Sequence, residues 1–115
     1  MEDRELLELA AKAAGIKGNF VEQCPEDGHP RYRCGIGKDG VFFDAWNPLA
    51  YDGEALSLAA ELRLHIKPGK HKGDGCTVET QRDGIAGCTA FYDDKAQQMR
   101  QAIVRAAAEI GKAMP

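Results

Sequence analysis

The sequence lacks the patterns that mark membrane, secreted and general nucleic-acid-binding proteins. No apolar run approaches the ~20 residues that a membrane-spanning helix needs. The opening segment MEDRELLELAAKAAG is charged and amphipathic, unlike the basic and then apolar stretches of a secretory signal. We therefore expect no membrane association and a cytoplasmic location. Because the net charge is −3, we also expect no general coating of nucleic acid.

Serine is nearly absent, and so are the usual surroundings of catalytic nucleophiles. Ser57 is the only serine and falls inside a predicted helix, while the three histidines lie in different segments without an adjacent acidic residue. The segment GKHKGDG, residues 69–75, lacks the order of a phosphate-binding loop. The adjacent Asp93 and Asp94 are better explained by helix capping than by acid–base chemistry. We therefore expect no enzyme activity, no catalytic residues and no cofactor.

The four cysteines lack the Cys-x-x-Cys knuckle that structural zinc sites usually contain. Cys24 and Cys34 bracket one predicted turn, and Cys76 and Cys88 bracket another. We expect no metal site, and we interpret each pair as cross-strand neighbours that stay reduced in a cytoplasm as small buried residues. The spacing leaves open whether either pair forms a disulfide.

What the sequence does contain is an alternation of helical and extended patterns within one domain, residues 1–115. Periodicity predicts helices over Asp3–Ala14, closed by Gly15, over about Gly53–Leu62, and over about Asp94–Ala113, capped by Asp94. Strand and turn signals predict extended segments at Phe20–Cys24, Arg31–Ile36, Val41–Ala45, Arg63–Lys67, Cys76–Thr80 and Ile85–Phe91. This order predicts an α+β fold, with two to three helices on an antiparallel or mixed sheet of about five to six short strands in a layered sandwich.

The second extended segment alternates in polarity. Tyr32, Cys34 and Ile36 occupy one phase, and Arg31, Arg33 and Gly35 occupy the other. Because successive side chains of a strand point to opposite faces, we expect the first set to be buried and the second to face water.

The segment WNPLAYDGEAL, residues 46–56, contains the only tryptophan and predicts a corner between a strand and a helix. Asn47 precedes a proline and is therefore biased toward extended geometry. We predict that Asp52 caps the helix and that Tyr51 and Leu56 form a hydrophobic staple. The residues to which we assign a structural role are Trp46, Asn47, Pro48, Leu49, Tyr51 and Asp52. An indole beside a turn could also line a ligand cleft, and this alternative stays open.

Three segments carry a resemblance to a known family: WNPLAYDGEALSLAAELRLHI, QAIVRAAAEIGKAM and DRELLELAAKAAGI. Together they resemble the small phage and prophage proteins of the phage ABA sandwich domain family, and they cover a little under half of the chain. The chain departs from the family pattern at Ala50-Tyr51, and the regions Lys17–Asp44 and Gly69–Gly87 look longer than is usual in the family. The resemblance implies a layered α/β fold and a phage origin, but no activity and no catalytic residues.

A local basic run stands out in this acidic protein and supplies the candidate binding residues, which are Arg63, His65, Lys67, Lys70, His71 and Lys72, together with Arg31 and Arg33. Such a run is either a solvated loop or a contact surface for an anion or a protein. We predict a phage- or prophage-encoded accessory protein of the host cell cytoplasm that acts by binding, to a host protein in a counter-defence or host-takeover role. The alternative is sequestration of a small anionic ligand such as a nucleotide signal. Convergence on one concave pocket with Trp46, Tyr51 or Tyr92 would favour the ligand, and spread over a flat surface would favour the protein partner; the cations that decide this are Arg31, Arg33, Lys67, Lys70 and Lys72. A homo-oligomer is also open.

Overall fold

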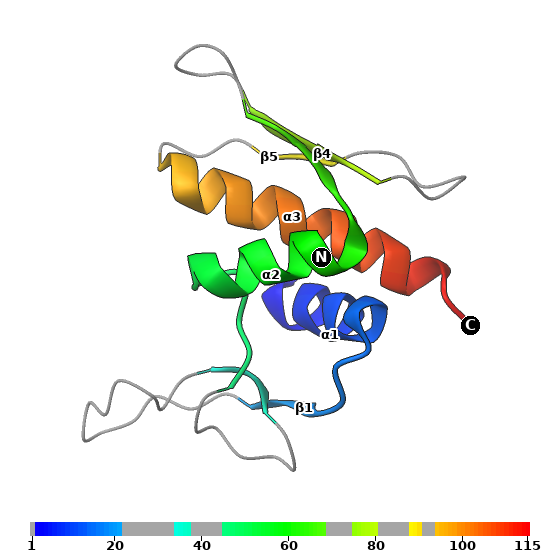
Figure 1. Cartoon of the computed structure of the whole chain (residues 1–115). Helices are drawn as coiled ribbons and strands as arrows, with labels where there is room; N and C mark the ends of the chain where they lie inside the picture. The colour runs from blue at the N-terminus through cyan, green and yellow to red at the C-terminus, as the bar shows by residue number, and fades with distance from the viewer. Residues whose placement is uncertain (1, 22–33, 38–44, 69–74, 81–87, 91–93) are drawn as a thin grey trace, which may run out of the picture.

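The computed structural model describes residues 2–21, 34–37, 45–68, 75–80, 88–90 and 94–115 (Figure 1). The three helices are α1 (Asp3–Ala14), α2 (Asp52–Leu62) and α3 (Lys95–Ala113). The described strands are β1 (Asn19–Val21), β2 (Gly35–Gly37), β3 (His65–Lys67), β4 (Cys76–Glu79) and β5 (Cys88–Ala90). The predicted α+β class and the three predicted helices are therefore confirmed.

The strands form two separate antiparallel sheets on either side of the helices. β1 pairs with β2, and the second sheet has the order β3-β4-β5. The two-stranded sheet packs against α1, and β4 and β5 pack against α3, so the helices lie between the sheets (Figure 1). The described residues thus do not form the single sheet of five to six strands that the sequence predicts.

Helix α3 lies at the centre of the core, between α1 and α2 on one side and the three-stranded sheet on the other. Its side chains at 102, 104, 106 and 107 are alanines and a valine with no exposed surface. Gly111 is also buried, and a Cβ placed there would overlap the main-chain carbonyl of Leu9 in α1. The absence of a side chain at this position therefore allows α1 and α3 to approach each other closely.

Helix α1 ends as the sequence predicts, at a glycine in the left-handed conformation. Gly15 has φ 74°, and its N–H donates to the carbonyl of Lys12 at 3.2 Å. The N–H of Ile16 donates to the carbonyl of Ala11 at 2.9 Å, which completes a Schellman motif. The predicted bounds of α1 and its predicted cap are both confirmed.

Helix α3 begins at the predicted cap. The Asp94 carboxylate Oδ1 accepts from the N–H groups of Ala96 and Gln97 at 2.9 and 3.3 Å. The predicted extent of α2 is confirmed, but its predicted cap is wrong, because Tyr51 occupies the N-cap position, Asp52 is the first helical residue and no side chain caps this end. The Asp52 carboxylate is instead directed toward α3, as described below.

The strand that contains Gly35 does not alternate between a buried and a wet face. Gly35, Ile36 and Gly37 are all buried, so the prediction that Gly35 faces water is wrong. The reason is the main chain of Trp46, which exchanges two 2.8 Å hydrogen bonds with Ile36 and approaches Gly35 so closely that a Cβ would overlap the Trp46 carbonyl. Of the residues predicted to be buried, Ile36 is buried and Cys34 is half-buried. The pattern residues at 31–33 lie outside the described part of the chain, and so do residues 41–44 of the predicted third strand.

Candidate functional site: the groove between α2 and α3

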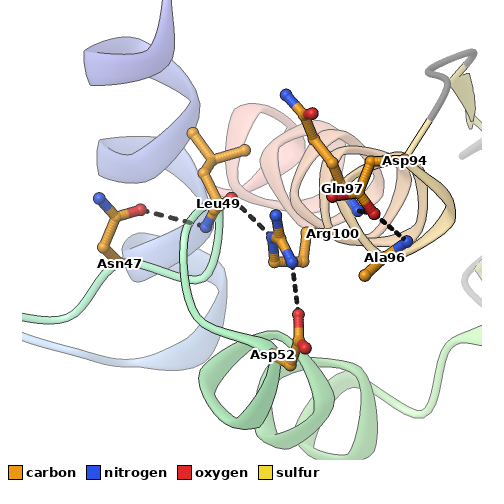
Figure 2. A network of polar contacts seen from close by, with 7 residues as sticks. All are labelled: Asn47, Leu49, Asp52, Asp94, Ala96, Gln97 and Arg100. Carbon is orange, nitrogen blue, oxygen red and sulfur yellow. Dashed lines mark hydrogen bonds and ion pairs between the residues drawn. The ribbon is translucent and has the colours of Figure 1, made fainter.

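The corner before α2 is held in place by hydrogen bonds of Asn47, whose main-chain carbonyl accepts from the N–H groups of Ala50 and Tyr51, both at 3.1 Å. Its side-chain Nδ2 donates to the carbonyl of Cys34, and its main-chain N–H donates to Glu54 Oε1, both at 3.1 Å. Its side-chain Oδ1 accepts from the N–H of Leu49 at 3.1 Å, which closes the turn over the intervening proline (Figure 2). One residue thus ties the corner to the start of β2 and to the first turn of α2.

The same corner is packed into the interior. Pro48 is fully buried, while Trp46 and Leu49 are half-buried and pack against both of the core clusters among the described residues. Trp46 therefore lies at the junction of the cluster around α3 and the cluster around α1 and β2. This position is what the sequence predicts for a structural anchor.

Arg100 joins this corner to α3. Its Nε donates to the carbonyl of Leu49 at 2.9 Å, and its Nη1 donates to Asp52 Oδ1 at 2.5 Å (Figure 2). The Arg100 side chain is 17% exposed, whereas that of Asp52 is 72% exposed. These charge-assisted contacts fix the first turn of α2 against α3 and explain why the Asp52 carboxylate does not cap its own helix.

A cavity of about 340 Å³ opens beside this contact, between the N-terminal halves of the two helices. We call it the α2–α3 groove; its lining residues are Asp52, Ala55, Leu56, Lys95, Ala96, Met99, Arg100 and Ile103. The wall is mainly apolar and includes the charged residues Asp52, Lys95 and Arg100. Leu56 is 66% exposed and is the only large hydrophobic side chain among the described residues that is exposed. The groove therefore exposes to solvent both an apolar cavity and, beside it, the apolar side chain of Leu56.

Two further cavities are found among the described residues. One, of about 340 Å³, lies on the other side of α2 and is lined by Ala14, Ile16, Trp46, Ser57, Leu58 and Glu61. The other, of about 470 Å³, is lined by Glu8, Ala11, Lys12, Gly15, Ile16, Lys17, Gly18 and Ile36. Neither these two cavities nor the groove has a histidine or a cysteine in its wall.

Comparisons of the chain with protein-family models, curated proteins and solved structures find no match. Within the described ranges, His, Cys, Asp and Glu side chains form no group of three or more that could hold a metal ion. None of the described helices combines the length and the apolar character needed to cross a membrane.

The predicted basic residues are only partly described. Arg63 ends α2, and His65 and Lys67 are exposed on β3, while Arg31, Arg33, Lys70, His71 and Lys72 lie outside the described residues. Lys67 Nζ lies 2.9 Å from Oε1 of Glu79 on β4, with which it forms an exposed ion pair. The hydrogen bond from Lys67, and then its charge and that of His65, lower the pKa of Glu79. Arg63, His65 and Lys67 line none of the three cavities.

The cysteines of the second predicted pair are two positions out of register. Cys76 lies opposite Ala90, and Cys88 lies opposite Val78. The Cys76 side chain is buried, and this burial raises the pKa of its thiol, with a partial opposite effect from the charge of Lys95. Of the first predicted pair, Cys24 lies outside the described residues.

The groove itself was not among the sequence predictions. The staple prediction is wrong, because Leu56 projects into water rather than over the start of its helix. One signal was available: Leu56 lies off the buried stripe of α2, which consists of Ala55, Leu58, Ala59 and Leu62. Helical periodicity alone predicts that a leucine outside the buried stripe of an amphipathic helix faces away from the core. No local feature of the sequence predicted that Arg100 would bond to Leu49 and Asp52.

Proposed function

We propose that this chain is a phage- or prophage-encoded accessory protein of the host cell cytoplasm, that it acts by binding a host protein, and that the α2–α3 groove is its contact surface. The phage origin and the layered-sandwich likeness rest on the family resemblance of the sequence, and the host partner is proposed from the phage origin. The choice of contact surface rests on the geometry of the groove.

The observation that carries this proposal is the exposure of Leu56 beside an apolar cavity. Burying a leucine side chain fully gains about 1.5–3 kcal/mol, and two-thirds of the surface of Leu56 is still available for burial. Interfaces commonly combine a central apolar anchor with a charged rim that directs the partner. Leu56 and Met99 fit the first role, and Asp52 and Lys95 fit the second.

The groove is also built to keep its shape. Arg100 bonds at once to the carbonyl of Leu49 and to the carboxylate of Asp52, so α2 cannot move away from α3 without breaking both contacts. A surface that is already in its binding geometry loses less conformational entropy when a partner docks. Rigidity of this kind supports a role in recognition.

The arrangement of the described cations supports a protein partner over a small anionic ligand. A ligand site would need several basic side chains to converge on one concave surface with an aromatic residue. Lys67 instead pairs with Glu79, and Trp46 lines a cavity whose charged residue is Glu61. We therefore keep the host protein as the proposed partner.

The proposal is tested with two glutamate substitutions at neighbouring exposed positions of α2. Leu56→Glu places a charge at the groove, whereas Ser57→Glu places the same charge on the other side of the helix, beside the cavity that contains Trp46. Tagged wild-type and variant proteins are recovered from host cells, and the retained proteins are quantified by mass spectrometry. We expect one host protein to be retained by wild type and Ser57→Glu and lost by Leu56→Glu.

Circular dichroism of both variants serves as the control for folding. Equal retention of the same proteins by all three chains would contradict the assignment of the groove. Recovery of a nucleotide as the sole retained molecule would replace the host protein by the small anionic ligand.

A further inference from the structure

We propose that the cavity on the other side of α2 from the groove is a binding site for a small methylated ammonium compound. This cavity of about 340 Å³, which we call the Trp46 cavity, is lined by Ala14, Ile16, Trp46, Ser57, Leu58 and Glu61. It shares no residue with the α2–α3 groove, so it is a second site, separate from the surface proposed for the host protein. Small-molecule sites have volumes of about 300–1,000 Å³, and a compound of a few carbon atoms suits a cavity at the lower end of that range.

The charge of the Trp46 cavity selects a cation. Among the described residues that line it, Glu61 is the only charged one. Glu61 is exposed, and its carboxylate forms no hydrogen bond or ion pair within the described part of the chain. The hydroxyl of Ser57, one turn earlier on the same face of α2, likewise has no partner among the described residues. A free carboxylate beside a cavity attracts a positively charged ligand and repels an anion.

Two helix ends add to the negative potential of this cavity. Ala14 is the last residue of α1, and Glu61 lies in the last turn of α2. The C-terminal end of a helix carries a partial negative charge, which favours a nearby cation and disfavours a carboxylate. The last turn of α2 contains no basic residue, while Lys12 of α1 lines a different cavity and donates to the carbonyl of Met114 at 3.0 Å. A bound cation would therefore supply the positive charge that the wall of the cavity lacks.

The rest of the wall favours an ammonium group that carries methyl groups. The Trp46 side chain is half-buried, and Ile16 and Leu58 add aliphatic surface. Cations are attracted to the face of an aromatic ring, most strongly to that of tryptophan, and quaternary ammonium ligands are recognised in this way. A primary ammonium group is strongly hydrated and loses hydrogen bonds to water when it enters an apolar wall. A quaternary ammonium group has no N–H to leave unpaired, and its methyl groups can pack against the apolar side chains.

Trp46 provides a direct reporter for the test, because the only tryptophan of the chain gives a single indole N–H signal in an NMR spectrum. The full chain is titrated at constant ionic strength with choline, ethanolamine or 3,3-dimethylbutanol. Choline carries a trimethylammonium group, ethanolamine carries a primary ammonium group in its place, and 3,3-dimethylbutanol keeps the shape of choline without its charge. We expect choline to shift the indole signal saturably, with a Kd on the order of 1 mM because Glu61 is exposed to water. The other two compounds should bind at least about threefold more weakly.

Two glutamine substitutions test the role of the carboxylate. Glu61→Gln should weaken choline binding by about threefold, since it removes the charge and keeps the size of the side chain. Glu109→Gln removes the same charge from an exposed position of α3 that lines none of the three cavities, and it should bind choline like the wild type. Circular dichroism confirms that both variants are folded.

The absence of a saturable shift with choline would overturn this inference. Equal binding of 3,3-dimethylbutanol would do the same, because it would mean that the cavity selects apolar shape and not charge. Equal or tighter binding of ethanolamine would refute the preference for methyl groups. Choline binding that is the same in wild type, Glu61→Gln and Glu109→Gln would refute the role of the Glu61 carboxylate.

Discussion

The close approach of α1 and α3 at Gly111 can be tested with a single added methyl group. Helix propensity alone predicts that Gly111→Ala stabilises the protein by about 1 kcal/mol, since alanine is the best helix former and glycine among the worst. The structure predicts the opposite. The new Cβ would overlap the carbonyl oxygen of Leu9, lie 2.8 Å from its carbonyl carbon and lie 3.3 Å from its Cα.

The size of the expected loss of stability depends on which atoms the new Cβ would contact. All three belong to the main chain of a packed helix and cannot turn aside as a flexible side chain would. Overpacking of a core costs roughly 1–3 kcal/mol, and a clash with main-chain atoms belongs at the upper end of that range. After the gain in helix propensity is subtracted, we expect a net loss of roughly 2 kcal/mol of unfolding free energy. At about 4 °C per kcal/mol, this lowers Tm by roughly 8 °C.

The assay is thermal and urea unfolding followed by circular dichroism, with Gly53→Ala as the matched control. Gly53 lies in the first turn of α2, and a Cβ there would have no other atom within 4 Å. Gly53→Ala should therefore leave stability unchanged or raise it by up to about 1 kcal/mol. A Gly111→Ala protein as stable as the wild type or the control would refute the reasoning.

Three further predictions concern other parts of the described structure. Trp46→Ala should cost about 3 kcal/mol in urea unfolding, because Trp46 packs against both core clusters; unchanged stability with lost partner binding would show that its role is in recognition. Arg63→Gly should stabilise the protein by about 0.5–1 kcal/mol, because Arg63 holds the left-handed conformation at φ 54°, and a loss of stability would count against that strain. Lys67→Met should bring the lowered pKa of Glu79 back toward its ordinary value in an NMR titration. Because that pKa is lowered in the fold, the ion pair stabilises the protein above the ordinary glutamate pKa and loses its contribution as the pH falls through the lowered value; an unchanged pKa in the variant would mean that the pair does not form.

Local sequence signals predict the helices well. The alternation of leucine and alanine with charged residues defines α1 from Asp3 to Ala14, and Gly15 ends it because this cap needs a positive φ. Asp94 was identified as a cap for a similarly local reason, since its carboxylate bonds to N–H groups only two and three residues away. Interactions that close within one helical turn can be read from neighbouring residues.

The failures have their cause in distant parts of the chain. Asp52 was predicted to cap α2, but its carboxylate pairs with Arg100, which is 48 residues away and more strongly attractive than an N–H group. Gly35 was assigned to a wet face, but the main chain of Trp46 covers it. The groove combines residues of α2 with residues of α3, so no single segment of the sequence predicts it. Only the position of Leu56 outside the buried stripe of α2 indicated an exposed apolar surface.

The central claim is that the face around Leu56 binds a host protein, and site-specific photocrosslinking in host cells tests it most directly. A photoreactive amino acid, benzoylphenylalanine, is placed at position 56 in one chain and at position 57 in a control chain, and irradiated cells are analysed for covalent adducts. We predict that position 56 yields an adduct with one host protein and that position 57 yields much less of it. If position 56 gives no host adduct, or if both positions give the same adducts in equal amounts, the claim that this face recognises a host protein is contradicted.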